Sequence, residues 1–142
     1  MNKSMLKALP FAATLLMACG GVASAQTVML TGQFAAEGAA TTQATGDVAA
    51  TLDTVTHKLS YTIHYAGLSG PVTVAHFHGP AKPGVSAGVL QPIAGPFQSG
   101  MTATVTVSAD TQKALLANLT YVNLHTTAYP KGEARAQMIV KP

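Results

Sequence analysis

Alternation of apolar and polar residues with a period of two is the feature that most constrains this fold. From Met101 to Val107 every second side chain is apolar, and the residues between them are threonines. Leu59, Tyr61 and Ile63 alternate with polar residues in the same way. This pattern is typical of antiparallel strands with one buried face, because successive side chains of a strand point to opposite sides. Further strands are expected over residues 27–36, 46–53, 71–78, 88–93, 120–126 and 133–140.

Residues that favour turns separate several of these runs. Glycine supplies unusual backbone angles and proline fixes one of them, so clusters of the two predict reversals of the chain. The cluster at 129–132 predicts an antiparallel hairpin between 120–126 and 133–140. Similar clusters occur at 67–71, 79–84 and 95–96.

One short helix is expected near residues 109–118, with Ser108 or Asp110 as its N-cap. Short strands at roughly ten-residue spacing with a single helical crossover are typical of a sandwich or a Greek-key barrel. The sequence therefore predicts an all-β fold, an antiparallel Greek-key β-sandwich with one short helix.

The N-terminal segment resembles a secretory signal peptide. Lys3 and Lys7 precede a short apolar run, and Ala23-Ser24-Ala25 gives the small-x-small pattern that signal peptidase reads. The run is shorter than the roughly 20 apolar residues of a membrane span. We expect residues 1–25 to be removed and residues 26–142 to form one periplasmic or secreted domain.

A second processing signal overlaps the first. Leu16-Met17-Ala18-Cys19 resembles a bacterial lipobox, in which Cys19 would carry lipid. The alternative location is therefore a lipid anchor to the membrane through Cys19. Because Cys19 is the only cysteine, the exported domain would contain no disulfide.

The charge distribution argues against nucleic acid as a partner. The chain carries eight basic and five acidic residues, a formal net charge of +3. Two of the basic residues, Lys3 and Lys7, belong to the expected signal peptide, so the exported domain is close to neutral. Its basic residues form no cluster, whereas nucleic-acid binders concentrate Lys and Arg on one surface.

Three histidines form the strongest chemical pattern. His76 and His78 are two residues apart in an expected strand, so both side chains share one face. His125 lies near the end of another expected strand, and loops at one end of a sandwich cluster together. Imidazole is a preferred ligand of copper and zinc. The pattern predicts a metal site at His76, His78 and His125, whereas His57 and His64 are interpreted as ordinary polar residues.

Glu133 and Arg135 follow the predicted turn between the last two strands, and both are expected to support the metal ligands from behind. Across the hairpin, Glu133 could accept the second ring N–H of His125, the usual orienting contact around a metal. The alternative is a surface pair of Glu133 with Arg135 that contributes little stability.

These residues together resemble a known family, the chordin-type (CHRD) domain. The resemblance covers about residues 28–140 and implies an immunoglobulin-like or superoxide-dismutase-like β-sandwich. It also implies an extracytoplasmic location, since the family occurs in an extracellular developmental regulator and in short exported bacterial proteins. Ala136 stands where the family commonly has glycine. The motifs that carry the resemblance are Leu30-Thr-Gly32, Ala75-His-Phe-His-Gly-Pro80, Gly84, Gly88, Tyr121-Val-Asn-Leu-His-Thr126 and Pro130-Lys-Gly-Glu-Ala-Arg-Ala-Gln137.

Two functional hypotheses follow from the sequence. The first is a metal-binding protein that holds copper, or less favourably zinc, for buffering, delivery or protection. The second is a non-catalytic interaction or structural module in which the histidines only hydrogen-bond. The chain carries no nucleophile or phosphate-loop motif, so we expect no enzyme. A copper-dependent redox enzyme is the minor alternative, and three histidines are too few for a two-metal dismutase site.

Overall fold

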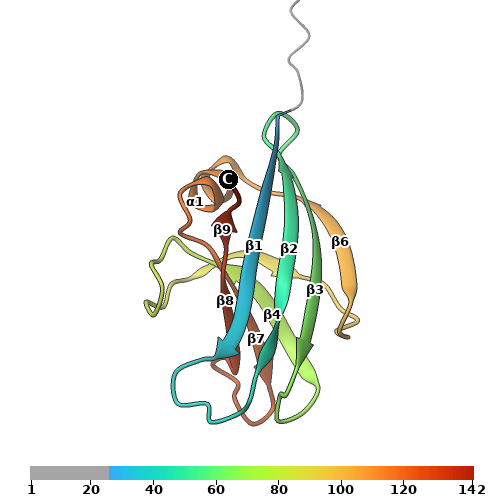
Figure 1. Cartoon of the computed structure of the whole chain (residues 1–142), viewed down its shortest axis with the longest axis vertical. Helices are drawn as coiled ribbons and strands as arrows, with labels where there is room; N and C mark the ends of the chain where they lie inside the picture. The colour runs from blue at the N-terminus through green and yellow to red at the C-terminus, as the bar shows by residue number, and fades with distance from the viewer. Residues whose placement is uncertain (1–25) are drawn as a thin grey trace, which may run out of the picture.

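The computed structural model describes residues 26–142. The expected signal peptide and the alternative lipid site at Cys19 lie outside the described residues. Figure 1 shows the arrangement of the strands and the helix. Their bounds are β1 Thr27–Ala36, β2 Thr45–Asp53, β3 Lys58–Ala66, β4 Val72–His78, β5 Val89–Ile93, β6 Met101–Thr106, α1 Ala109–Leu116, β7 Tyr121–Thr126, β8 Ala134–Gln137 and β9 Ile139–Val140.

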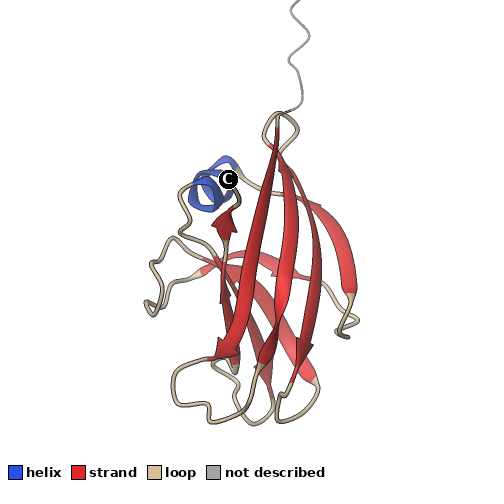
Figure 2. Cartoon of the chain, viewed as in Figure 1, coloured by secondary structure: helices blue, strands red, loops and turns tan. Residues whose placement is uncertain are grey.

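The strands form two antiparallel layers that curl toward each other (Figure 2). The first layer has the order β6-β3-β2-β1, and the second has the order β5-β4-β7-β8. The chain crosses from β3 in the first layer to β4 in the second and returns after β5, so that β6 lies beside β3. This return beside an earlier strand is a Greek-key connection. The predicted all-β, antiparallel Greek-key architecture is confirmed.

Strand β1 joins the two layers, which the alternation pattern did not indicate. Its first part pairs with β2 and β9, and its last residues, Phe34–Ala36, pair with β8. Gly32 pairs with Val48 of β2, and on the opposite edge of β1 it lies between the residues that pair with β9 and those that pair with β8. A Cβ at Gly32 would be 2.8 Å from the backbone oxygen of Gln137. Only glycine permits this close approach, so Gly32 lets β1 lie against the segment that joins β8 to β9.

The core lies between the layers and follows the predicted alternation. Leu59, Tyr61 and Ile63 of β3 are buried, and Tyr61 meets Phe77 of β4 edge-on with 5.2 Å between ring centroids. Phe77 and Ala75 face this core. Because strand side chains alternate, His76, which lies between them, and His78, which follows Phe77, point to the outer face of the second layer.

Strand β7 is buried on both faces. Val122 and Leu124 belong to the core cluster, while Tyr121 and Asn123 are also buried although they point the other way. The loop 79–88 and the turn between β7 and β8 lie over this outer side, as the contacts described below show. The second layer therefore has a covered, polar outer face.

The helix begins where the sequence indicated. The Ser108 side chain accepts a hydrogen bond from the Thr111 backbone N–H at 3.1 Å, which identifies Ser108, not Asp110, as the N-cap. The helix ends at Leu116, and Asn118 follows in a left-handed conformation with φ of 60°. None of the helices within residues 26–142 is long and apolar enough to cross a membrane.

Candidate metal centre

Three histidine side chains come together on the outer face of the second layer. The side chains of His76 and His78 project from the outer face of β4, because the neighbouring side chains of Ala75 and Phe77 are buried in the core. His125 projects from the adjacent strand β7, where it lies opposite Val74, two residue pairs along the ladder from the pair of His76 with Asn123. The sequence expectation that these three rings converge agrees with their positions in the structure.

The rings are close enough to share one metal ion. One ring nitrogen from each histidine lies within 4.8 Å of one ring nitrogen from each of the others. The ring centroids are 5.3 Å apart for His76 and His78, and 5.4 Å apart for His76 and His125. The third pair, His78 and His125, is 6.1 Å apart. Such a triangle of imidazoles is a donor set for copper or zinc.

Backbone carbonyls fix two of the rings. His78 Nδ1 donates to the carbonyl oxygen of Ala87 at 3.0 Å, and His125 Nδ1 donates to that of Pro130 at 3.0 Å. Because a carbonyl can only accept, each Nδ1 carries the proton and each Nε2 keeps its lone pair. This is the usual second contact of a metal-ligating histidine, which sets both the tautomer and the direction of the ring.

Three of the four remaining ring nitrogens are buried without a hydrogen-bond partner. They are His78 Nε2, His125 Nε2 and His76 Nδ1, one from each histidine of the cluster. Buried polar atoms are nearly always hydrogen-bonded, because leaving one unpaired is costly. Three unpaired nitrogens in one cluster are what a metal ion would satisfy together.

The electrostatics of the cluster keep His76 neutral. Burial and the positive charges that His125 and His78 would carry hold the pKa of His76 below its ordinary value of 6.5. A neutral ring offers a lone pair, whereas a protonated ring cannot bind a metal. His76 is therefore available as a ligand at neutral pH.

The expected contact between Glu133 and His125 is wrong. His125 donates to Pro130 instead, and the fully buried Glu133 carboxylate accepts hydrogen bonds from Ser69, whose backbone N–H lies 2.6 Å from Oε1, and from the Thr126 hydroxyl. Glu133 lies in the turn before β8, where strand alternation does not apply. It ties the loop before β4 to the end of β7 and makes no contact with the ring.

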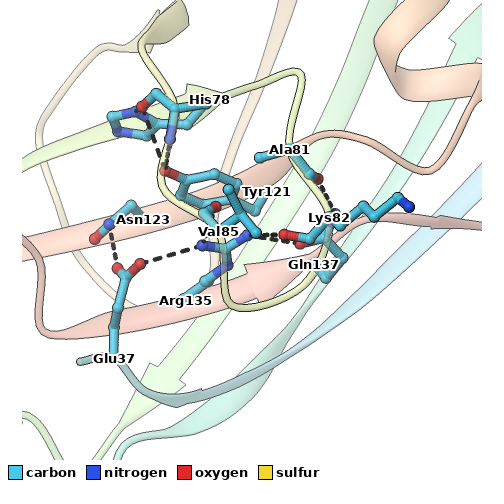
Figure 3. A network of polar contacts seen from close by, with 10 residues as sticks. Glu37, His78, Ala81, Lys82, Val85, Tyr121, Asn123, Arg135 and Gln137 are labelled. Atoms are coloured by element: carbon cyan, nitrogen blue, oxygen red, sulfur yellow. Dashed lines mark hydrogen bonds and ion pairs between the residues drawn. The ribbon is translucent and has the colours of Figure 1, made fainter.

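Arg135 does not form the surface pair with Glu133 that was the alternative interpretation. Its Cζ lies 3.5 Å from the centre of the Tyr121 ring, and the other face of Tyr121 stacks on His78 (Figure 3). Its ion-pair partner is Glu37 at 3.4 Å rather than Glu133. The Arg135 side chain is nearly buried. It is linked to the histidine cluster through the ring of Tyr121, which stacks on His78.

Arg135 also fastens the loop that covers the site. Its guanidinium donates to the carbonyl oxygens of Val85 at 2.9 Å and Lys82 at 3.0 Å. The Ala87 N–H at the end of this loop donates to the Tyr121 hydroxyl at 3.0 Å. Ala87 thus receives contacts from both rings of the stack, and loop 79–88 is held over the outer face by backbone groups.

Sequence reasoning missed three residues of this site: Tyr121, Asn123 and Glu37. The signal for two of them was present, because Tyr121, Asn123 and His125 alternate along one strand and must share its outer face. Glu37 has no such signal, since it follows β1 and reaches the site only through the folded structure.

The two remaining histidines lie apart from the cluster, as expected. His57 Nδ1 contacts Gln112 Oε1 at 2.9 Å, and the exposed His64 lies 3.7 Å from the Asp47 carboxylate. Neither belongs to a group of potential metal ligands within the described residues.

Comparison with known proteins identifies the family. The family model of the CHRD domain matches residues 26–138, which cover nearly all of the described chain. No curated protein and no solved structure matches the chain. The match includes both histidine-bearing strands and the β7–β8 hairpin. The chain belongs to the CHRD domain family.

Proposed function

We propose that this protein binds one copper ion through His76, His78 and His125, outside the cytoplasm. The observation that carries the proposal is the set of three buried, unpaired ring nitrogens, one from each histidine of a single cluster. Copper is favoured over zinc because a nitrogen site without strict geometric selection binds Cu²⁺ more tightly than the other divalent first-row metals.

The role proposed is buffering, delivery or protection rather than turnover. CHRD membership is consistent with an extracellular module, and the signal-like segment 1–25 supports export. The three histidines lie on two adjacent, paired strands of the sheet. A site formed on strands is positioned more precisely than one formed on loops, which suits retention of a bound ion.

The second candidate is an interaction module with structural histidines. It is favoured by the contacts of His78 and His125 with Ala87 and Pro130, which pin two loops without any metal. On this hypothesis His→Ala changes would weaken the fold, and no metal would be retained.

Metal content after dialysis distinguishes the two. The exported protein is incubated with Cu²⁺ or Zn²⁺, dialysed and assayed for metal per chain. We expect one copper per chain in the wild type, none in His78→Ala, and one in the control His57→Ala, whose ring lies outside the cluster. Circular dichroism checks that each variant is folded. No retained copper in the wild type would refute the proposal and favour the interaction module.

A further inference from the structure

Asn123 occupies the centre of the outer face on which the histidines lie. The strand register places it opposite His76 on β4 and opposite Arg135 on β8. Along β7 it lies two residues before His125, on the same face. Its side chain is only 3% exposed. A polar amide is thus buried directly beside the histidine cluster.

The orientation of this amide is fixed by its partners. Asn123 Nδ2 donates to the carboxylate of Glu37, and Arg135 Nη1 holds that carboxylate at 3.4 Å (Figure 3). A carboxylate only accepts, so it selects the NH₂ end of the amide. Gly132 packs against the amide, since a Cβ there would lie 2.5 Å from both Asn123 Nδ2 and Asn123 Oδ1.

The other end of the amide has no partner. Asn123 Oδ1 is buried and accepts no hydrogen bond. Four of the seven such atoms within residues 26–142 belong to this small area, namely the three ring nitrogens and Asn123 Oδ1. An unpaired buried carbonyl is costly, which indicates that a hydrogen-bond donor is missing beside it.

We propose that Asn123 Oδ1 accepts a hydrogen bond from a water molecule in the fourth coordination position of the metal. This inference rests on the proposed function, because it requires a metal at His76, His78 and His125. Three imidazoles leave a four-coordinate ion one open position, which a water or a small anion can fill. Asn123 is then the positioning residue that decides between them.

The fixed direction of the amide gives this position a chemical preference. A ligand with a proton, such as water, can donate to Asn123 Oδ1. An anion that can only accept, such as azide, would face the lone pairs of Oδ1 across the same gap and be repelled. Glu37 enforces the preference by keeping Asn123 Nδ2 turned toward itself, away from the metal.

Azide titration of the copper(II)-loaded protein tests the inference, with binding followed by the azide-to-copper charge-transfer band. Asn123→Leu removes the acceptor, and we expect azide to bind about tenfold more tightly, the effect of one unfavourable polar contact. Glu37→Gln should act in the same direction, because the new amide can donate to Asn123 Oδ1 and allow Nδ2 to face the metal. Asp47→Asn, an exposed carboxylate on β2, is the matched control and should leave azide affinity unchanged.

The outcomes separate this inference from the proposed function. Tighter azide binding in both Asn123→Leu and Glu37→Gln supports it, and Glu37→Gln alone decides if the leucine variant does not fold. Equal azide affinity in wild type and variants, with one copper per chain in all, overturns the role of Asn123 and leaves the copper site standing. Absence of copper from the wild type overturns both.

Discussion

The rings of His78 and Tyr121 lie face to face, with 9° between their planes and 5.0 Å between their centroids. Arg135 covers the same tyrosine with its guanidinium. His78, a proposed metal ligand, therefore has an aromatic ring and then a cation stacked against it, which hold its plane in one direction. The Tyr121 ring contacts the face of the His78 ring, while the Ala87 carbonyl accepts a hydrogen bond from His78 Nδ1.

Replacing Tyr121 should weaken metal binding without abolishing it. Tyr121→Leu removes the stacked ring, and we expect copper affinity to fall by about 10- to 100-fold, the usual effect of losing a group that orients a ligand. The stoichiometry should remain one copper per chain. Competition with a copper chelator of known affinity measures the change. Tyr121→Phe, which keeps the ring, is the control, and equal losses in both variants would contradict a stacking role.

Much of this architecture follows from local sequence patterns. The alternation at Leu59, Tyr61 and Ile63 predicted which side of β3 is buried, and the two-residue spacing of His76 and His78 predicted a shared face. Both depend only on the geometry of a single strand, in which side chains alternate. Ser108 as a helix cap is likewise a local property.

The remaining features depend on contacts between distant segments. The stack of Arg135 on Tyr121 requires the β7–β8 register, and Glu37 reaches Asn123 across 86 residues of sequence. The sequence predicts a strand that begins at Glu133 and so places this residue beside His125, but Glu133 lies in the turn before β8 and accepts a hydrogen bond from Ser69. Alternation predicts which face of the sheet a side chain occupies within a strand, but it does not apply to residues beyond the ends of the strand.

Glu133 should stabilise the fold in a pH-dependent way. Burial alone would raise the pKa of Glu133, but hydrogen bonds from Thr126 and Ser69 outweigh it and hold the pKa below the ordinary value of 4.5. A carboxyl with a lowered pKa contributes stability that is complete above its unfolded-state value and is lost as pH falls through the folded-state value.

Glu133→Gln should therefore cost about 1–3 kcal/mol of unfolding free energy at neutral pH, because the buried hydroxyl and N–H donors lose a charged acceptor. The difference from wild type should shrink as the pH falls below 4.5, where the carboxyl becomes protonated. Denaturant unfolding at several pH values measures this, with Asp47→Asn as an exposed control. A difference that stays constant into acid would contradict the account.

The lowered pKa of His76 predicts a second acid sensitivity, at higher pH. The unfolded chain binds a proton at this ring near its ordinary value of 6.5, whereas the folded chain resists it. Stability from this group is therefore complete above 6.5 and is lost as pH falls below that value toward the folded-state pKa.

Thermal unfolding of the metal-free protein between about pH 7.5 and about pH 5.5 tests this linkage. We expect the melting temperature to fall with pH in the wild type and to fall less in His76→Gln, which cannot take up the proton. His64→Gln alters an exposed ring and should keep the wild-type slope. Copper loading should steepen the slope, because protons compete with the metal. Identical slopes for wild type and His76→Gln would refute the linkage.

X-ray absorption of the copper-loaded protein tests the central claim most directly, because it counts the imidazoles bound to the ion. The account predicts three imidazole nitrogens at about 2.0 Å in the wild type, as is usual for metal–histidine bonds. It predicts that the three-imidazole signal is lost in His125→Ala and retained in the control His64→Ala. A spectrum with no imidazole ligands, or one that His125→Ala leaves unchanged, would contradict the three-histidine site.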